Sequence, residues 1–247
     1  MKYKISGKLS DGPVSRYINR PISMRITSFV LHIWKNASPN IMTIIAFLIG
    51  ILSAMSYLFV GPLIAGIAVQ IASIIDGVDG EIARALKKRS SFGAFLDSML
   101  DRFVDIAIII CITVYLARSQ YVNMEVLSLV SLLALSGTIL VSYARGKSQQ
   151  LFGENPEIER MNFATRDVRL FIIFLGSILG FLLETLILLA IMTYLQVLAR
   201  MCLVAKYYKT ISRQSEKNIE TADFKGISKV ENTNPFYDLQ QAQLEDF

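Results

Sequence analysis

The sequence has a single histidine, His32, and two cysteines, Cys111 and Cys202, among its 247 residues. Catalysis by histidine and binding of zinc are therefore nearly excluded, because these chemistries depend on imidazole or thiolate groups. Each cysteine falls inside an apolar run, where cysteine is a common buried residue. We interpret both as packing residues rather than as a disulfide or a metal site.

Charge is also scarce, and the apolar residues are gathered into runs. The chain is 18% charged and 53% hydrophobic, with a mean hydropathy of +0.47, whereas a soluble domain carries about 25% charged residues. Runs of about 17–25 apolar residues are long enough to cross a bilayer. The pattern predicts an all-α integral membrane protein with six transmembrane helices, at Ile41–Phe59, Leu63–Ile75, Phe92–Leu116, Val126–Tyr143, Val168–Leu183 and Thr185–Val204. The second run is short unless its helix continues through the following "DGVDG".

The lysines and arginines lie in alternate connections between these runs, which indicates the orientation of the chain. With the N-terminus in the cytoplasm, Arg118 is the only cation on the outer side, and a tight outer turn is expected near Leu183–Glu184. We therefore expect a multi-pass protein of the cell membrane, in contact with lipid and with no nucleic-acid partner. Its net charge of +5 would be concentrated on the cytoplasmic face.

Three parts are expected along the chain: a cytoplasmic N-terminal segment, 1–40; a six-helix domain, 41–205; and a polar cytoplasmic tail, 206–247. The tail is mixed in charge, and we expect a short helical extension followed by weak order. Ser38 and Pro39 are typical of a helix start, with Ser38 as the cap and Pro39 in the first turn.

The N-terminal segment contains an apolar residue at every fourth position, with polar residues between. This pattern predicts an amphipathic helix lying in the membrane interface. The apolar positions are Val14, Ile18, Ile22, Ile26 and Val30. Pro21 is expected to kink or split this helix. The alternative is a direct role for Arg16 or Arg20 in substrate binding.

Aspartates stand where the second and third apolar runs meet. Asp76 and Asp79 are three residues apart and share a helix face. Asp97, Asp101 and Asp105 recur every four residues and form one stripe on the next helix. A short basic loop joins the two helices, so we expect antiparallel neighbours with their carboxylates facing each other. Asp105 is expected to pair with Arg102 or to support this site.

Four carboxylates held together need protons or cations to offset their repulsion. A single aspartate at the centre of a membrane helix already costs roughly 2.5–3.5 kcal/mol. A set of oxygen ligands without histidine or cysteine favours a hard ion, Mg²⁺ or Mn²⁺. Two such ions about 3.5–4 Å apart form a known clamp for displacement at phosphorus, and a carboxylate can accept the proton of the attacking hydroxyl.

The residues from Asp76 to Asp101 resemble the signature of the CDP-alcohol phosphotransferase family, D-x2-D-G-x2-A-R-x8-G-x3-D-x3-D. Every fixed position is present, at Asp76, Asp79, Gly80, Ala83, Arg84, Gly93, Asp97 and Asp101. With the six-span plan and the interfacial helix, the resemblance covers roughly residues 12–205 and leaves the tail outside.

The resemblance implies transfer of a phosphoalcohol group from a CDP-alcohol to an acceptor hydroxyl, with release of CMP. It implies two Mg²⁺ or Mn²⁺ ions held by Asp76, Asp79 and Asp97, with Asp101 as general base, also in contact with a metal. Residues that would bind the CDP are Asn40, Thr43, Gly80, Ala83, Arg84 and Gly93. It also implies a homodimer.

The acceptor is expected to be anionic, because arginines collect on the cytoplasmic side of the later spans. The candidates for binding its phosphate are Arg145, Arg169 and Arg200. Within the family, "DGPVSRYINRPIS" and "DGVDGEIAR" are most similar to the synthases of di-myo-inositol phosphate phosphate. These enzymes join CDP-inositol to inositol phosphate and make a precursor of a compatible solute. The alternative is a synthase of phosphatidylinositol phosphate or archaetidylinositol phosphate, which uses a CDP-lipid donor.

Two readings without catalysis stay open at this point. Acids within a membrane also occur in transporters, so a membrane transport or binding protein is one alternative. In the other, the acids are structural and form salt bridges with Arg84, Lys87 and Lys88.

Overall fold

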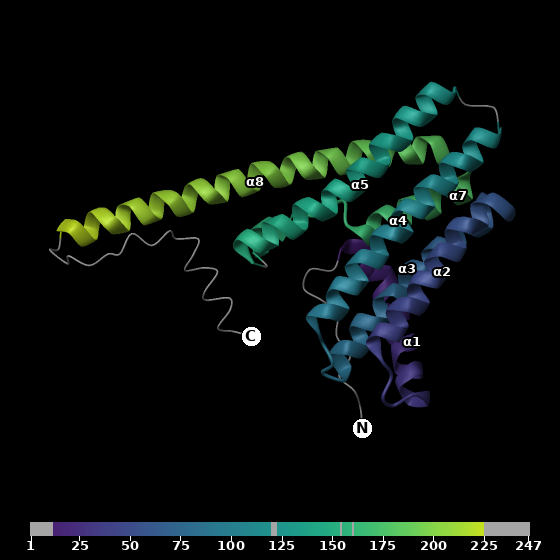
Figure 1. Cartoon of the computed structure of the whole chain (residues 1–247), viewed down its shortest axis with the longest axis horizontal. Helices are drawn as coiled ribbons and strands as arrows, with labels where there is room; N and C mark the ends of the chain where they lie inside the picture. The colour runs from purple at the N-terminus through teal and green to yellow at the C-terminus, as the bar shows by residue number, and fades with distance from the viewer. Residues whose placement is uncertain (1–11, 120–122, 154, 160, 225–247) are drawn as a thin grey trace. The chain divides into compact units, whose positions relative to one another are not determined.

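The computed structural model describes residues 12–119, 123–153, 155–159 and 161–224, and these residues form helices and short connections (Figure 1). A π-helical segment, η1 (Ser15–Asn19), leads into α1 (Arg20–Ile33). The further helices are α2 (Pro39–Phe59), α3 (Pro62–Ala85), α4 (Ser91–Ser119), α5 (Met124–Phe152), α6 (Pro156–Glu159), α7 (Arg166–Leu179) and α8 (Leu182–Phe224). The prediction of an all-α fold is confirmed.

The chain divides into two compact units. The first contains residues 1–139 and 163–193, and the second contains residues 140–162 and 194–247. In the first unit α2 packs against α3 and α4, and α3 also packs against α1 and α7 (Figure 1). The core of this unit is apolar, with fully buried side chains that include Tyr57, Ile108 and Leu186. The boundary between the units falls within α5 and α8.

Four helices are long and apolar enough to cross a membrane, by length and composition. They are α2, α3, α5 and the part of α8 from Leu182 to Arg213. The helix α3 continues through "DGVDG", which gives the short second run its full length. The helix α7 has 14 residues, and at 1.5 Å per residue it extends only about 21 Å. The other two of the six predicted spans, α4 and α7, are not among these four helices, so six spans are not confirmed.

The predicted turn near Leu183–Glu184 lies earlier in the chain. The helix α7 ends at Leu179, and Gly180 has a φ of 79°. Glycine adopts this left-handed conformation without a steric penalty and commonly ends a helix. The apolar run continues on both sides of Gly180, and for this reason hydropathy placed the break too late.

The N-terminal helix has its polar face buried. Asn19, Ser23 and Thr27 are buried, whereas Ile18 and Ile22 are exposed. Pro21 lies in the first turn of α1, directly after the π-helical segment, and the backbone of Asn19 and Arg20 stays right-handed helical. The helix therefore changes from π to α at this point without a break, so the predicted split is not seen. The apolar stripe that was expected to meet the membrane has exposed side chains at Ile18 and Ile22. Ile26 and Val30 are instead partly buried against a core cluster that includes Val78 and Ile82 of α3. The polar residues between the stripe positions pack against α3.

Two further predictions concern the start of α2 and the polar tail that follows the last apolar run. Pro39 is in the first turn of α2 as predicted. Ser38 stands at the N-cap position, but its side chain makes no capping hydrogen bond. The helix α8 runs on to Phe224, so the predicted extension is present, and the remainder of the predicted tail lies outside the described residues.

Candidate active site

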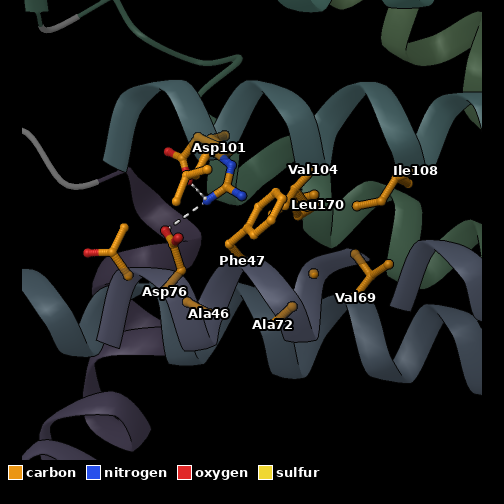
Figure 2. Close-up of a pocket in the computed structure, with 13 residues that line it drawn as sticks. Ala46, Phe47, Val69, Ala72, Asp76, Asp101, Val104, Ile108 and Leu170 are labelled. Carbon is orange, nitrogen blue, oxygen red and sulfur yellow. Dashed lines mark ion pairs between the residues drawn. The ribbon is translucent and has the colours of Figure 1, made fainter. Parts of the chain in front are cut away.

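The aspartates of α3 and α4 face each other, as their spacing predicts. Figure 2 shows the two helices running in opposite directions, with Asp76 on α3 near Asp101 on α4. Carboxylate oxygens of Asp76, Asp97 and Asp101 all lie within 4.8 Å of one another. Residues 21 to 25 positions apart in the sequence thus meet through the pairing of two helices.

Asp79 is held by the first turn of α2. The hydroxyl of Thr43 donates to Oδ2 of Asp79 at 2.5 Å, and the N–H of Gly80 donates to Oδ1. The side chain of Asp79 is buried. Thr43 was predicted to bind the nucleotide, and this stays a prediction. In the structure its hydroxyl orients Asp79.

A cation lies within the acid cluster, and it comes from α7. Nη1 of Arg166 is 2.8 Å from Oδ2 of Asp76 and 2.9 Å from Oδ1 of Asp101, and these ion pairs are the dashed lines in Figure 2. Nε of Arg166 also donates to Asp105 at 3.1 Å. Sequence reasoning did not select Arg166 for the site. The signal that was available is the charge of four clustered acids, which requires a nearby cation.

The cluster suits a hard divalent ion. Its donors are carboxylate oxygens, which Mg²⁺ and Mn²⁺ prefer. Oxygens on opposite sides of a Mg²⁺ ion are about 4 Å apart, since each bond is about 2.0–2.1 Å. The carboxylate oxygens of Asp76, Asp97 and Asp101 lie within 4.8 Å of one another, near this separation, and one guanidinium neutralises only part of their charge.

A pocket of about 240 Å³ lies between the start of α2, the end of α3 and the start of α4. All six residues predicted to bind CDP line it. They are Asn40, Thr43, Gly80, Ala83, Arg84 and Gly93. Asp79 and Asp97 also line this pocket, so it opens onto the carboxylates. Sequence reasoning missed three further lining residues, Lys88, Arg89 and Ser90, from the loop between α3 and α4.

The glycines of the signature keep this pocket open. A Cβ atom on Gly93 would lie 3.0 Å from both Oδ1 of Asn40 and Oγ of Ser90. A Cβ atom on Gly80 would lie 3.3 Å from Nη1 of Arg84. Larger side chains at these two positions would displace polar groups that line the pocket.

Arg169, one of the three predicted acceptor ligands, takes part in a buried network. Its Nη2 lies 3.0 Å from Oδ2 of Asp105, and its Nη1 donates to the carbonyl of Thr138 at 2.9 Å. Asp105 also pairs with Arg102 at 3.4 Å, as expected. These contacts favour a structural role for Arg169, and its role in acceptor binding stays a prediction.

The other two acceptor candidates lie in the second unit, where Glu159 joins them. Oε2 of Glu159 is 3.3 Å from Nη2 of Arg145, and Oε1 is 3.7 Å from Nη1 of Arg200. Arg200 is 3% exposed and also donates to Ser148 at 2.6 Å and to Asn162. The Nε atoms of both arginines are buried with no hydrogen-bond partner among the described residues. Sequence reasoning had not assigned a role to Glu159.

Comparison with known proteins identifies the family. A model of the family described as CDP-alcohol phosphatidyltransferase matches residues 36–211. The chain belongs to the CDP-alcohol phosphatidyltransferase family. The match contains the aspartate cluster and the pocket beside it, and it confirms the resemblance that the signature carries.

Curated relatives include two groups of named synthases. The chain is 36% identical over 210 residues to the "Bifunctional IPC transferase and DIPP synthase" of Aquifex aeolicus, which is 83% of this chain and 47% of that protein. It is 39% identical over 174 residues to the protein of the same name from Archaeoglobus fulgidus, 69% of this chain and 33% of that protein. This chain thus spans about half the length of these relatives or less.

The second group consists of archaetidylinositol phosphate synthases. The synthase of Methanothermobacter thermautotrophicus is 33% identical over 199 residues, which is 78% of this chain and 91% of that protein. Alignment with this relative therefore extends over nearly its full length.

Solved structures of one other protein share the fold. Phosphatidylinositol phosphate synthase of Mycobacterium tuberculosis with CDP-DAG bound has a TM-score of 0.61 at 21% identity, covering 74% of this chain and 94% of that one. The same protein in complex with manganese and citrate gives a TM-score of 0.62 at 22% identity, covering 74% and 88%. At these identities the likeness shows the fold alone.

Proposed function

We propose that the protein transfers a phosphoalcohol group from a CDP-alcohol donor to an acceptor hydroxyl and releases CMP. The proposal rests on one observation: the predicted CDP pocket and the carboxylate cluster have a residue in common. The pocket lined by all six predicted CDP residues is also lined by Asp79 and Asp97, and Asp97 belongs to the carboxylate cluster. A nucleotide in this pocket would have its diphosphate next to the acids.

The residues divide the chemistry between them. Asp76, Asp79, Asp97 and Asp101 would hold two Mg²⁺ or Mn²⁺ ions, which when bound neutralise the charge of the diphosphate oxygens. The small residues Gly80, Ala83 and Gly93 leave room for the nucleotide. Arg84 offers a planar guanidinium, which suits a phosphate group.

Asp101 would act as the general base. Its carboxylate takes the proton of the acceptor hydroxyl, whose oxygen forms a bond to the β-phosphorus of the donor. The bond from this phosphorus to the bridging oxygen breaks, and that oxygen leaves with CMP. Asp101 lies within the cluster and is held by Arg166 at 2.9 Å, and a diphosphate bound at the cluster would be near its carboxylate.

The donor in this proposal is CDP-inositol and the acceptor is inositol phosphate, giving di-myo-inositol phosphate phosphate. The relatives that contain a DIPP synthase, at 36% and 39% identity, support this choice. Arg145 and Arg200, which meet at Glu159, are the candidates for the acceptor phosphate. Each has a buried Nε atom with no hydrogen-bond partner among the described residues.

The second candidate is a synthase that uses a CDP-lipid donor with the same acceptor. The alignment over 91% of an archaetidylinositol phosphate synthase supports this alternative. The metal chemistry would be identical, because the ions contact only the diphosphate. The difference lies in whether the donor enters from water or from the bilayer.

We also propose how the enzyme lies in the membrane and that it forms a homodimer. The catalytic part would occupy residues 41–205 in a six-span arrangement, with α1 in the membrane interface and the aspartates at the cytoplasmic side. Exposed apolar side chains on η1 and α1, among them Tyr17, Phe29 and Ile33, support the interfacial position of this helical segment. A homodimer is proposed from the family resemblance.

A competition between donors tests the proposal. Purified protein in detergent micelles receives CDP-inositol and a CDP-lipid at equal concentration, with Mg²⁺ and radiolabelled inositol phosphate. We expect consumption of CDP-inositol and a labelled product that stays in the aqueous phase. A labelled product in the organic phase, with CDP-inositol unused, would assign the CDP-lipid reaction instead. Binding of both donors without release of CMP would leave a binding protein rather than an enzyme.

A further inference from the structure

The helix α3 has a third acid, Glu81, which the proposed reaction does not use. Glu81 stands between Gly80 and Ala83 of the signature, at a position that the signature leaves open. Glu81 is fully buried, with an exposed fraction of 0%. A buried carboxylate within an apolar helix requires compensating partners, because an unpaired charge there is strongly destabilising.

Among the described residues, the hydrogen-bond partners of Glu81 come from one face of α1. Oε1 accepts hydrogen bonds from Nη1 of Arg20 at 2.8 Å and from the hydroxyl of Ser23 at 2.6 Å. Oε2 accepts one from the hydroxyl of Thr27 at 2.6 Å. Residues 20, 23 and 27 are spaced at one helical turn, so a single face of α1 supplies one cation and two hydroxyls to one carboxylate.

Arg20 also contacts the backbone between two of the proposed metal ligands. Its Nη1 donates to the carbonyl of Gly77 at 3.2 Å, and Gly77 directly follows Asp76. A Cβ atom on Gly77 would lie 3.1 Å from this Nη1. The absence of a side chain at Gly77 therefore lets the guanidinium reach the backbone of the ligand segment.

Glu81 and the proposed metal ligands are on opposite sides of α3. At 100° per residue, Glu81 is about 170° from the midpoint of Asp76 and Asp79. The contacts with α1 thus hold the back of the segment whose front bears the carboxylates. A rotation of α3 by about 20° would move an oxygen about 6 Å from the helix axis by about 2 Å, far more than a metal site tolerates.

We propose that Arg20 and Glu81 are positioning residues, which fix the rotation of α3 so that Asp76 and Asp79 point toward Asp97 and Asp101. The proposal rests on the metal site of the proposed function and not on the identity of donor or acceptor. It gives the interfacial helix a role in the geometry of the active site, in addition to its contact with the membrane.

The same interface offers a matched control. Oδ1 of Asn19 accepts a hydrogen bond from Gln70 at 2.8 Å, and its Nδ2 donates to Ser73 at 3.0 Å. These residues are buried and also join the N-terminal segment to α3. Gln70 is six residues before Asp76, or about 9 Å along the helix. Its loss weakens the interface without releasing the ligand segment.

The test measures the affinity for Mn²⁺ by calorimetry, together with the thermal midpoint of unfolding, in full-length protein in detergent. The variants are Glu81→Gln, Arg20→Gln, their combination, and the control Gln70→Leu. We expect each single positioning variant to weaken Mn²⁺ binding about tenfold or more, the range seen for partners of metal ligands. The double variant should lose little more than either single variant, because the two residues act as one unit.

The control decides between positioning and general stability. Gln70→Leu is expected to lower the thermal midpoint but to leave Mn²⁺ affinity within about twofold of wild type. An equal loss of affinity in Gln70→Leu, or wild-type affinity in Glu81→Gln, would overturn the proposal. If Glu81→Gln does not fold, Thr27→Val removes one hydrogen bond at constant volume and should weaken Mn²⁺ binding by a smaller factor.

Failure of the proposed function gives a different result. Wild-type protein that binds no Mn²⁺ would remove the metal site itself. Hydrogen exchange of the backbone amides of residues 76–80 then tests the positioning contacts without metal. Faster exchange in Glu81→Gln but not in Gln70→Leu supports them, and equal exchange in the two variants overturns them.

Discussion

Nη1 of Arg166 lies 2.8 Å from Oδ2 of Asp76, so a side-chain cation occupies part of the carboxylate cluster. The same Nη1 is 2.9 Å from Asp101. Arg166 and a divalent ion would therefore draw on the same oxygens. In metal-free protein the guanidinium offsets the repulsion of the acids, and on metal binding it has to share or give up these contacts.

Replacement of Arg166 by Ala should have opposite effects on stability and on metal binding. Metal-free protein loses the cation that neutralises Asp76 and Asp101, so its thermal midpoint should fall by several degrees. Mn²⁺ no longer competes with the guanidinium, so its apparent affinity should rise severalfold. Calorimetry of Mn²⁺ binding and thermal unfolding with and without metal measure both effects.

Arg102→Ala is the control for Arg166→Ala, because Arg102 pairs with Asp105, which is not among the proposed metal ligands. It should lower stability without a gain in Mn²⁺ affinity. A loss of affinity in Arg166→Ala would mean that the guanidinium orients the carboxylates rather than competing with the ion.

The aspartates should separate into ligands and base. Asp76→Asn and Asp79→Asn are expected to weaken divalent-metal binding as well as turnover, because each removes a charged ligand. Asp101→Asn should abolish turnover while it keeps more of the binding of Mn²⁺ and CDP. Titration of both ligands into each variant distinguishes them, and equal losses of binding in all three would remove the separate role of Asp101.

Gly93→Ala should weaken donor binding without a comparable loss of stability. The added Cβ atom would lie 3.0 Å from Asn40 Oδ1 and Ser90 Oγ, so the pocket lining has to shift. Gly146→Ala is a matched control within a helix, since nothing lies within 4 Å of a Cβ atom there. The control should keep the donor KM and gain about 0.5–1 kcal/mol of stability. A donor KM unchanged in Gly93→Ala would place the nucleotide elsewhere.

Among the three acceptor candidates, Arg169 should behave differently from Arg145 and Arg200. Arg145→Ala and Arg200→Ala should raise the KM for the acceptor about tenfold or more, since a charge-assisted phosphate contact contributes roughly 1.5–3 kcal/mol. The donor KM should change little. Arg169→Ala should instead lower stability by about 3 kcal/mol, because Asp105 loses a buried partner. Acceptor kinetics of wild type in both Arg145→Ala and Arg200→Ala would refute this site.

Much of the candidate site could be predicted from the sequence because its information is local. The spacing of Asp76, Asp79, Asp97 and Asp101 already places them on helix faces, and hydropathy supplies the helices that hold them. The family resemblance, rather than spacing or hydropathy, supplied the six residues predicted to bind CDP; all six line one pocket, and their contact with CDP stays a prediction. Periodicity also gave α1, whose polar residues face α3.

The missed features depend on contacts between distant segments. Arg166 reaches the acids from α7, 65 positions after Asp101 in the sequence, and only tertiary packing brings it there. Glu81 was not singled out from the sequence, and its burial depends on contacts with α1, about 60 positions earlier in the chain. Arg169 was selected as a phosphate ligand from its charge and its place at a helix end, and its pairing with Asp105, 64 positions earlier, was not visible in the pattern.

The most direct test of the account is the amount of CMP formed by purified protein from CDP-inositol and inositol phosphate. It should be measured with Mg²⁺, with excess chelator, and in the variant Asp97→Asn. The account predicts CMP and phosphodiester in equal amounts with Mg²⁺, and almost none in the other two reactions. CMP formed at the same rate in chelator or in Asp97→Asn would contradict it, as would the absence of CMP with Mg²⁺ from both CDP-inositol and a CDP-lipid.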